Sequence, residues 1–233
     1  MDELAKSPSK HHKSEADRLR LDGVDTAGLS LREFDAAVAE RYGVVCGIDE
    51  AGRGPLAGAV FAAAVILDPE NPIDGLNDSK KLTEKKREKL YDEIIAKAKA
   101  YCIASSSVEE IEQTDILSAD MEAMKRAYES LGEQAGIVIV DGDVLPELSA
   151  NAKALTKGDA TSEAVAAASV LAKVSRDRYM CEQAKLYPGY GFEKHKGYGT
   201  AAHYEAVDKL GLCPLHRKSF FKKYFEKKHG QED

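Results

Sequence analysis

The chain has 233 residues, which is enough for one large domain or for one domain with an extension. Its 33 basic and 40 acidic residues give a formal net charge of −7, which argues against nonspecific adhesion to nucleic acid over the whole surface. Any contact with a polyanion must therefore be local, as at the basic clusters around Lys80 and near the C-terminus.

The sequence offers no long uncharged run that would cross a bilayer, and residues 1–20 lack the apolar stretch of a signal peptide. We therefore expect a soluble, cytoplasmic protein without a membrane partner. The four cysteines are widely spaced and form none of the close pairs typical of zinc or thiol redox motifs. Free thiols in a reducing compartment are expected.

The hydrophobic periodicity alternates between strand and helix patterns after a disordered start at about 1–14. In chain order, the expected elements are short helices at 14–21 and 30–42, strands at 44–49 and 58–67, a helix at 83–100, a strand at 101–106, a helix at 116–131, strands at 137–140 and 152–156, and an alanine-rich helix at 162–185. Ser107 and Glu110 have capping-box spacing. A first antiparallel hairpin followed by this alternation indicates an α/β protein with a mixed sheet flanked by helices.

Two of these strands end in carboxylates. Asp49 and Glu50 follow the first apolar strand, and Asp141 follows the continuous apolar run at 137–140. Asp143 lies two residues further on, but Gly142 and the nearby proline indicate a turn, which makes Asp143 a weaker candidate. Acidic residues at strand ends are typical both of solvated turns and of metal sites, and the surrounding motif decides between these interpretations.

Gly52-Arg53-Gly54 comes immediately after the first acidic pair. Glycine allows close approach of the backbone to a ligand, and the guanidinium group offers forked donors to an anion. A dinucleotide-binding fingerprint does not fit, because Gly58 comes one residue late and a second strand follows instead of a helix. The pattern therefore indicates a metal site that meets a phosphate, built on a strand, a tight glycine turn and another strand.

Seven short sequence strings together resemble type 2 ribonuclease H (ribonuclease HII). In order, over 44–221, they are GIDEAGRGPLAG, LNDSKKL, VDGD, TKGDATS, AAASVLAKVSRDRYM, HKGYGT and HRKSF. The resemblance implies a ribonuclease H-like fold, a mixed five-stranded sheet flanked by helices, with a helical C-terminal part. The related type 3 enzymes carry a larger N-terminal domain and a glutamate at the last metal position, so Asp159 and the short N-terminal extension favour type 2.

The resemblance also implies the site residues. Asp49, Glu50, Asp141 and Asp159 match the four carboxylates that bind two divalent ions, Mg²⁺ or Mn²⁺, and they are the expected catalytic residues. Expected substrate contacts are Gly52, Arg53 and Gly54 at the ribonucleotide, Tyr198 at the sugars of the RNA–DNA junction, and Ser79 and Lys80 at phosphates. Without the resemblance, Tyr198 would be interpreted as a half-buried loop aromatic.

The implied activity is endonucleolytic hydrolysis of the RNA strand of RNA/DNA hybrids. It includes cutting 5′ to a single ribonucleotide embedded in duplex DNA, which leaves a 5′-phosphate and a 3′-hydroxyl. Removal of misincorporated ribonucleotides is the implied cellular role. The alternatives are a type 3 ribonuclease H-like enzyme, a non-catalytic module that binds RNA/DNA hybrids, and a small-phosphate hydrolase with the same metals.

Three segments follow from this interpretation. Residues 1–42 form an N-terminal extension, partly disordered or helical, residues 43–215 form the catalytic domain, and residues 216–233 form a basic, aromatic C-terminal helix that packs on the domain. The expected partners are RNA/DNA hybrids and ribonucleotide-containing DNA, and a monomer is expected. A replication-clamp partner stays open, since nothing in the residues supports one.

Overall fold

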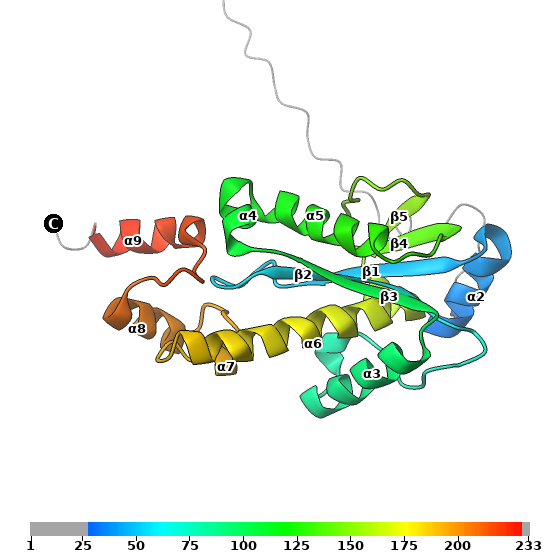
Figure 1. Ribbon diagram of the computed structural model, residues 1–233, viewed down its shortest axis with the longest axis horizontal. Coiled ribbons are helices and arrows are strands. Elements are labelled where there is room, and N and C mark those ends of the chain that lie inside the picture. Colours follow the sequence, from blue (N-terminus) through cyan, green and yellow to red (C-terminus); the bar gives the residue numbers. More distant parts are fainter. Residues whose placement is uncertain (1–27, 230–233) are drawn as a thin grey trace, which may run out of the picture.

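The sheet at the centre of the protein is mixed and five-stranded, with the order β3-β2-β1-β4-β5 (Figure 1). The computed structural model describes residues 28–229, so the helix predicted at 14–21 and the disordered start lie outside the described part of the chain. The strands are β1 (Val45–Ala51), β2 (Val60–Ile66), β3 (Ala100–Ser106), β4 (Ile137–Asp141) and β5 (Ala152–Leu155). The first three pair in antiparallel fashion, whereas β4 pairs in parallel with β1 and β5 with β4. The predicted mixed sheet is confirmed.

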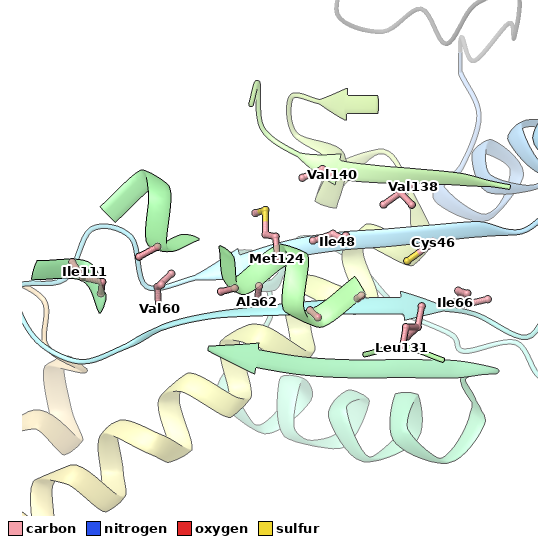
Figure 2. Packing of buried hydrophobic residues seen from close by; sticks show 14 residues of the cluster. Cys46, Ile48, Val60, Ala62, Ile66, Ile111, Met124, Leu131, Val138 and Val140 are labelled. Atoms are coloured by element: carbon pink, nitrogen blue, oxygen red, sulfur yellow. The ribbon is translucent and has the colours of Figure 1, made fainter. Parts of the chain in front are cut away.

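Helices cover both faces of the sheet (Figure 1). On one face lie α4 (Val108–Gln113) and α5 (Ile116–Glu129), and on the other lie α3 (Glu84–Lys97) and α6 (Glu163–Leu186). Residues of β2 alternate between the two cores: Ala62 and Ala64 pack towards Met124 of α5 (Figure 2), whereas Ala63 and Val65 pack towards α3 and α6. This alternation is the period-2 geometry of a strand buried on both faces.

The first turns of α6 lie unusually close to β1, at Gly47. A Cβ atom at this position would lie 2.2 Å from the backbone carbon of Ala164 and 2.3 Å from the nitrogen of Val165. Only glycine permits that approach, and the alanines at 164, 166, 167 and 168 keep the facing surface of the helix shallow. The start of α6 is thereby held against the strand that carries Asp49.

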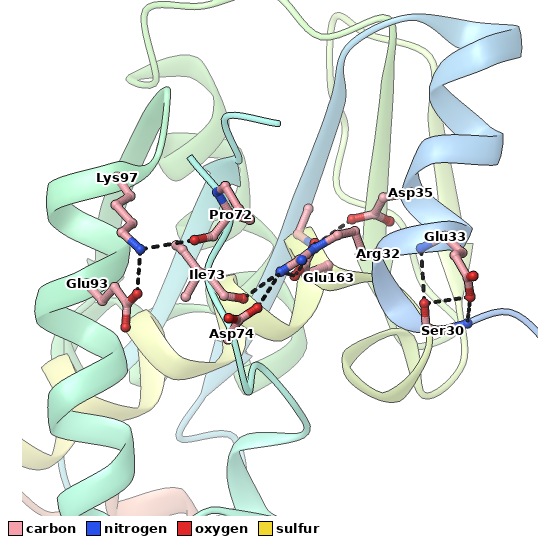
Figure 3. A network of polar contacts seen from close by, with 11 residues as sticks. Ser30, Arg32, Glu33, Asp35, Pro72, Ile73, Asp74, Glu93, Lys97 and Glu163 are labelled. Carbon is pink, nitrogen blue, oxygen red and sulfur yellow. Dashed lines mark hydrogen bonds and ion pairs between the residues drawn. The ribbon is translucent and has the colours of Figure 1, made fainter. Parts of the chain in front are cut away.

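Helix α2 (Leu31–Tyr42) begins at Ser30 with a capping box and joins this same helix start (Figure 3). Arg32 binds Glu163 with a 2.9 Å ion pair, and Oδ2 of Asp35 accepts a hydrogen bond from the backbone amide of Ala164 at 2.7 Å. Phe34 and Val38 are buried against β4 and β5. Residues 31–42 therefore pack into the core around the sheet.

Beyond the sheet, α6 continues to the C-terminal part of the chain (Figure 1). This part contains α7 (Phe192–His195), α8 (Ala201–Leu210), the 3₁₀ turn η3 (Lys218–Phe221) and α9 (Lys222–His229). Buried Phe192, Val207 and Phe221 form a core of their own, and Met180 of α6 belongs to it. Tyr224 and Phe225 of α9 pack against this cluster.

Most predicted elements are present, but the tight glycine turn is wrong. Strand β1 continues to Ala51, β2 begins only at Val60, and residues 52–59 form a loop whose carbonyl groups bind side chains elsewhere. The predicted helix at 83–100 ends at Lys97, because residues 98–99 are needed to turn the chain into β3. All four cysteines are free thiols. None of the helices between residues 28 and 229 is both long and apolar enough to span a membrane.

The carboxyl group of Asp35 makes stability depend on pH. Burial raises its pKa to about 7, and its Oδ1 atom is buried without a hydrogen-bond partner. Because the native pKa exceeds the unfolded value, the free energy of unfolding should fall as the pH rises towards and through 7. Asp35→Asn keeps an acceptor for Ala164, so we expect it to raise this free energy at pH 8 by roughly 1–3 kcal/mol and to have little effect at pH 4. Denaturant melts at both values measure this, and equal effects at the two would contradict the assignment.

Candidate active site

Asp49 and Asp141 lie at the same level, where β1 and β4 stop pairing with each other. Strands β1 and β4 are parallel neighbours in which Ile48 pairs with Val140, so the next residues on the two strands are these two aspartates. Glu50 follows on β1, where it pairs with Ala62 of β2. The carboxyl ends of the two central parallel strands thus supply three carboxylates to one edge.

Asp159 reaches the same edge from the 3₁₀ turn η2 (Gly158–Ala160). Lys157 precedes the turn in the left-handed region with φ 60°, which is uncommon for a residue with a side chain. The turn is fixed by a 2.6 Å hydrogen bond from the amide of Gly158 to Oδ1 of Asp141. This bond ties the loop that carries Asp159 to the end of β4.

Electrostatic repulsion between these carboxylates is strong. Burial raises the pKa of Asp49 well above its usual range, and the charges of Glu50, Asp141 and Asp159 raise it further. The pKa of Asp159 is raised to about 6 by burial and by Asp141. Burial also raises the pKa of Glu50, against the opposing effect of Arg53. Ionising all of these carboxylates at once is therefore unfavourable without an added cation.

Such a set of oxygen donors fits hard divalent cations, which prefer carboxylate ligands. As the side chains stand, no three His, Cys, Asp or Glu residues of the described chain form a group ready to hold a metal ion. Glu50 instead turns one oxygen towards Arg53 at 3.2 Å, and its other oxygen is buried without a hydrogen-bond partner. The Nζ atom of Lys80 lies 3.9 Å from Asp159. Reorientation of Glu50 would free both of its oxygens for an ion.

A fifth carboxylate, Asp120 of α5, lies fully buried behind Arg53. Its Oδ2 atom is 3.2 Å from Nε of Arg53, but neither of its oxygens accepts a hydrogen bond. Burial, with the charge of Glu50, raises its pKa to about 8. Arg53 thus bridges Glu50 and Asp120. Sequence reasoning missed this residue, although an aspartate between Ala119 and Ala123 on the apolar stripe of a helix was a visible signal.

Two buried arginines bind the backbone carbonyls of the loop at 52–59, here called the glycine loop. Arg217 donates to the carbonyl oxygens of Gly52, Arg53, Pro55 and Gly58 at 2.7–3.0 Å. Arg176 of α6 donates to the carbonyls of Ala57, Ala59 and Lys196 at 3.1 Å. Within the described chain neither forms an ion pair with a carboxylate, and burial lowers the pKa of Arg217 to about 9.

Gly52 is the point at which this loop needs glycine. Its φ is +111°, and an added Cβ would lie 2.2 Å from Nε of Arg176. Gly54 is different, since it is exposed and the nearest atom to an added Cβ is Cε1 of Tyr198 at 3.9 Å. The loop therefore packs tightly on its arginine side and faces Tyr198 on its open side.

Tyr198 follows α7 and remains 45% exposed. Its ring lies beside Gly54 and 6.0 Å from the guanidinium carbon of Arg176. The amide of Leu56 donates to the carbonyl of Gly197 at 2.8 Å, so the Tyr198 segment is bound to the glycine loop through the backbone. The structure thus brings together Gly54 and Tyr198, two of the predicted substrate contacts.

Ser79 and Lys80, in the 3₁₀ turn η1 (Ser79–Lys81), face different surroundings. Ser79 is buried, and its hydroxyl is hydrogen-bonded to that of Ser169 on α6 at 2.7 Å. The side chain of Lys80 is 80% exposed and reaches the carboxylates. Asp78 caps this turn by accepting the amide of Lys80 at 2.9 Å.

A protein-family model described as ribonuclease HII matches residues 46–227. The chain belongs to the ribonuclease HII family. A ribonuclease HII from Idiomarina loihiensis is 59% identical over 177 residues, which is 76% of this chain and 95% of that protein. A ribonuclease HII from Burkholderia thailandensis is 54% identical over 85% of this chain and 91% of its own length.

Solved structures agree with this membership. The crystal structure of ribonuclease H2 from Pyrococcus horikoshii matches with a TM-score of 0.64 and 30% identity, over 76% of this chain and 93% of that one. The ribonuclease HII of Archaeoglobus fulgidus, solved as a complex with PCNA, matches with a TM-score of 0.62 and 27% identity. The match covers 75% of this chain and 93% of that one. Like the ribonuclease HII family in general, this chain is an endoribonuclease that degrades the RNA of RNA/DNA hybrids, and the family depends on divalent metal ions.

Replacing Arg217 tests the support of the glycine loop. Arg217→Lys keeps the charge but loses the planar fork, so one ammonium group cannot satisfy four carbonyls. We expect the free energy of unfolding to fall by ~2–4 kcal/mol. Chemical denaturation measures the change, with the exposed neighbour Lys218→Arg as the matched control, expected to behave as wild type. Wild-type stability of Arg217→Lys would contradict the proposed support.

Proposed function

We propose that this member of the ribonuclease HII family cuts on the 5′ side of a ribonucleotide, whether in an RNA/DNA hybrid or alone in duplex DNA. The products are a 5′-phosphate and a 3′-hydroxyl. The proposed catalytic and metal-binding residues are Asp49, Glu50, Asp141 and Asp159. The observation that supports this assignment most directly is the parallel register of β1 and β4, which sets Asp49 and Asp141 at the same level, together with the hydrogen bond that ties the Asp159 turn to Asp141.

The proposed cofactor is a pair of divalent ions, Mg²⁺ or Mn²⁺, because both are hard cations that take carboxylate and phosphate oxygens. When bound, such a pair activates the attacking water and stabilises the departing oxygen. The chain supplies the negative charge that holds the ions. Glu50 leaves Arg53 to act as a ligand, and the carboxyl group of Asp120 remains beside Arg53.

The substrate contacts are proposed on the open side of the same edge. The backbone N–H groups of Gly52-Arg53-Gly54 and the carbonyl of Gly54, which Arg217 does not bind, suit a 2′-hydroxyl that both donates and accepts hydrogen bonds. Tyr198, half exposed beside Gly54, packs on the sugars at the junction. Lys80 binds a phosphate, and its place beside Asp159 supports this role.

Ser79 is proposed to act through its backbone, since its hydroxyl is engaged with Ser169. The proposed substrates are RNA/DNA hybrids and DNA duplexes with embedded ribonucleotides, bound by a monomer. A cytoplasmic location stays a prediction from the sequence. PCNA is the partner in the Archaeoglobus fulgidus complex, and no residue contact described above argues for a clamp partner of this chain.

Metal binding should stabilise the fold, because the ions relieve the repulsion between the carboxylates. With Mn²⁺ at about 100 times its dissociation constant, we expect a gain near ~2.7 kcal/mol over protein in EDTA. Asp49→Asn removes one repelling charge. We expect this variant to melt at a higher temperature than wild type in EDTA and to gain much less from Mn²⁺. Differential scanning fluorimetry measures both effects.

The matched control is Asp143→Asn, which removes an exposed carboxylate two residues beyond Asp141. We expect it to keep the wild-type response to Mn²⁺. A full response in Asp49→Asn, or its loss in Asp143→Asn, would contradict the assigned ligands.

The substrate prediction concerns one hydroxyl group. A DNA duplex with a single ribonucleotide should be cut immediately 5′ to that nucleotide in Mg²⁺ or Mn²⁺, whereas the all-DNA duplex of the same sequence should stay intact, because only the former offers a 2′-hydroxyl to the loop. Product ends are identified on sequencing gels. Binding without cleavage would favour the hybrid-binding module, and equal hydrolysis of a generic phosphoester would favour the small-phosphate hydrolase.

A further inference from the structure

Two buried histidines join the backbone of Tyr198 to the segment before Arg217. Nδ1 of His203, in α8, lies 3.0 Å from the carbonyl oxygen of Tyr198, and Nε2 lies 3.1 Å from Nε2 of His216. On the far side, the amide of Cys213 donates to Nδ1 of His216 at 2.9 Å, and the Sγ and carbonyl oxygen of Cys213 lie further from the same nitrogen, at 3.2 and 3.3 Å. Both rings are buried, with 0% and 1% exposure, so water cannot substitute for any of these contacts.

The two ends of this chain of contacts fix the direction of its hydrogen bonds. A carbonyl oxygen only accepts, so Nδ1 of His203 must carry a proton at the Tyr198 end. At the Cys213 end, the backbone amide makes the shortest contact with Nδ1 of His216, and the Cys213 carbonyl already accepts the amide of His216 at 3.0 Å, so Nδ1 is assigned as the acceptor. Between them, Nε2–H of His216 then donates to the bare Nε2 of His203. The requirements from opposite ends agree, and each neutral ring satisfies both of its neighbours.

A second proton on either ring would break this arrangement. A doubly protonated His203 would face the Nε2–H of His216, and a doubly protonated His216 would face the amide of Cys213. Burial opposes such charging, because it lowers the pKa of His203 and lowers that of His216 to about 4. The ring of His195 stacks on that of His203 at 4.4 Å, and Phe192 meets it edge-on. The surroundings thus favour two neutral rings.

We propose that His203 and His216 are positioning residues for Tyr198, joined in a one-way hydrogen-bond relay in which His203 carries its proton on Nδ1 and His216 on Nε2. This inference rests on the proposed contact between Tyr198 and the substrate. The δ tautomer of His203 is a consequence of its two partners and is specific to the relay.

The relay acts at the place where the Tyr198 segment meets the glycine loop. The carbonyl of Tyr198 is held by His203, and the adjacent amide of Gly197 donates to Nδ1 of His195 at 3.2 Å. The carbonyl of Gly197 accepts the amide of Leu56 from the loop. His216 is also the immediate neighbour of Arg217, which binds the loop from below. The distance between the Tyr198 ring and Gly54 therefore depends on the relay.

The tautomers can be measured on the wild-type chain without substrate or metal. Long-range ¹H–¹⁵N correlation spectra at neutral pH distinguish the protonated ring nitrogen from the bare one, and loss of a signal set in His203→Asn assigns that ring. We expect Nδ1–H for His203 and Nε2–H for His216. An Nε2–H tautomer or a charged ring for His203 would overturn the relay.

The positioning role is tested by kinetics on the duplex with one ribonucleotide. Asparagine places an amide N–H close to the position of Nδ1, whereas leucine removes the donor. We expect His203→Leu to raise KM by ~3- to 10-fold with kcat within about twofold of wild type, and His203→Asn to recover most of the loss. Val207→Ala in the same helix is the control, since it opens a cavity but removes no hydrogen-bonding group; it should leave KM unchanged.

The outcomes separate the relay from the function on which it rests. An unchanged KM in His203→Leu, or an equal rise in Val207→Ala, would show a merely structural role and overturn the proposal. Tyr198→Ala tests the underlying contact, and we expect it to raise KM at least as much as His203→Leu. An unchanged KM there would refute the substrate contact and the positioning role together, while the tautomers would still be decided by the spectra. If His203→Leu does not fold, the wild-type spectra still decide the relay.

Discussion

Asp49 and Asp141 lie at the same level on the neighbouring parallel strands β1 and β4. This register brings two acidic side chains together in a buried setting. The rest of the site follows from this repulsion. Chain folding alone does not relieve it, since Glu50 binds Arg53 and Lys80 reaches only Asp159. A site with unneutralised carboxylates of this kind is stabilised by the cations that its chemistry needs. The crowded carboxylates therefore lower the stability of the metal-free fold and, in the proposed site, raise its affinity for metal ions.

The cationic half of the site is built on a different principle. The guanidinium groups of Arg217 and Arg176 donate hydrogen bonds to backbone carbonyls instead of forming ion pairs with carboxylates. These bonds fix the shape of the loop at 52–59 and leave two positive charges next to it. Asp49 and Glu50 come just before this loop on β1, and the exposed ring of Tyr198 lies beside its Gly54. In the proposed complex, a polyanionic strand would meet the proposed metal ligands, backbone amides and an aromatic ring within one edge of the sheet, although the whole chain carries a net charge of −7.

Local patterns predicted the elements well because their periods reflect direct packing. The apolar run at 137–140 is a buried central strand, and the capping box at Ser107 begins a helix as expected. The order of the motifs also indicated the family before any coordinates. The tight glycine turn was wrong for a physical reason: the loop carbonyls find their hydrogen-bond donors in Arg176 and Arg217, far away in the sequence, so the loop need not close on itself.

The sequence could not predict contacts between residues that only the tertiary fold brings together. Asp120 gave a faint signal as a charge on an apolar helical stripe, but nothing local connects it to Arg53. The link from His216 through His203 to Tyr198 joins residues that no periodicity relates. The central claim is that four carboxylates seat two divalent ions, and anomalous diffraction from crystals soaked in Mn²⁺ tests it most directly. The account predicts two manganese peaks bounded by Asp49, Glu50, Asp141 and Asp159; peaks elsewhere, or none at saturating metal, would contradict it.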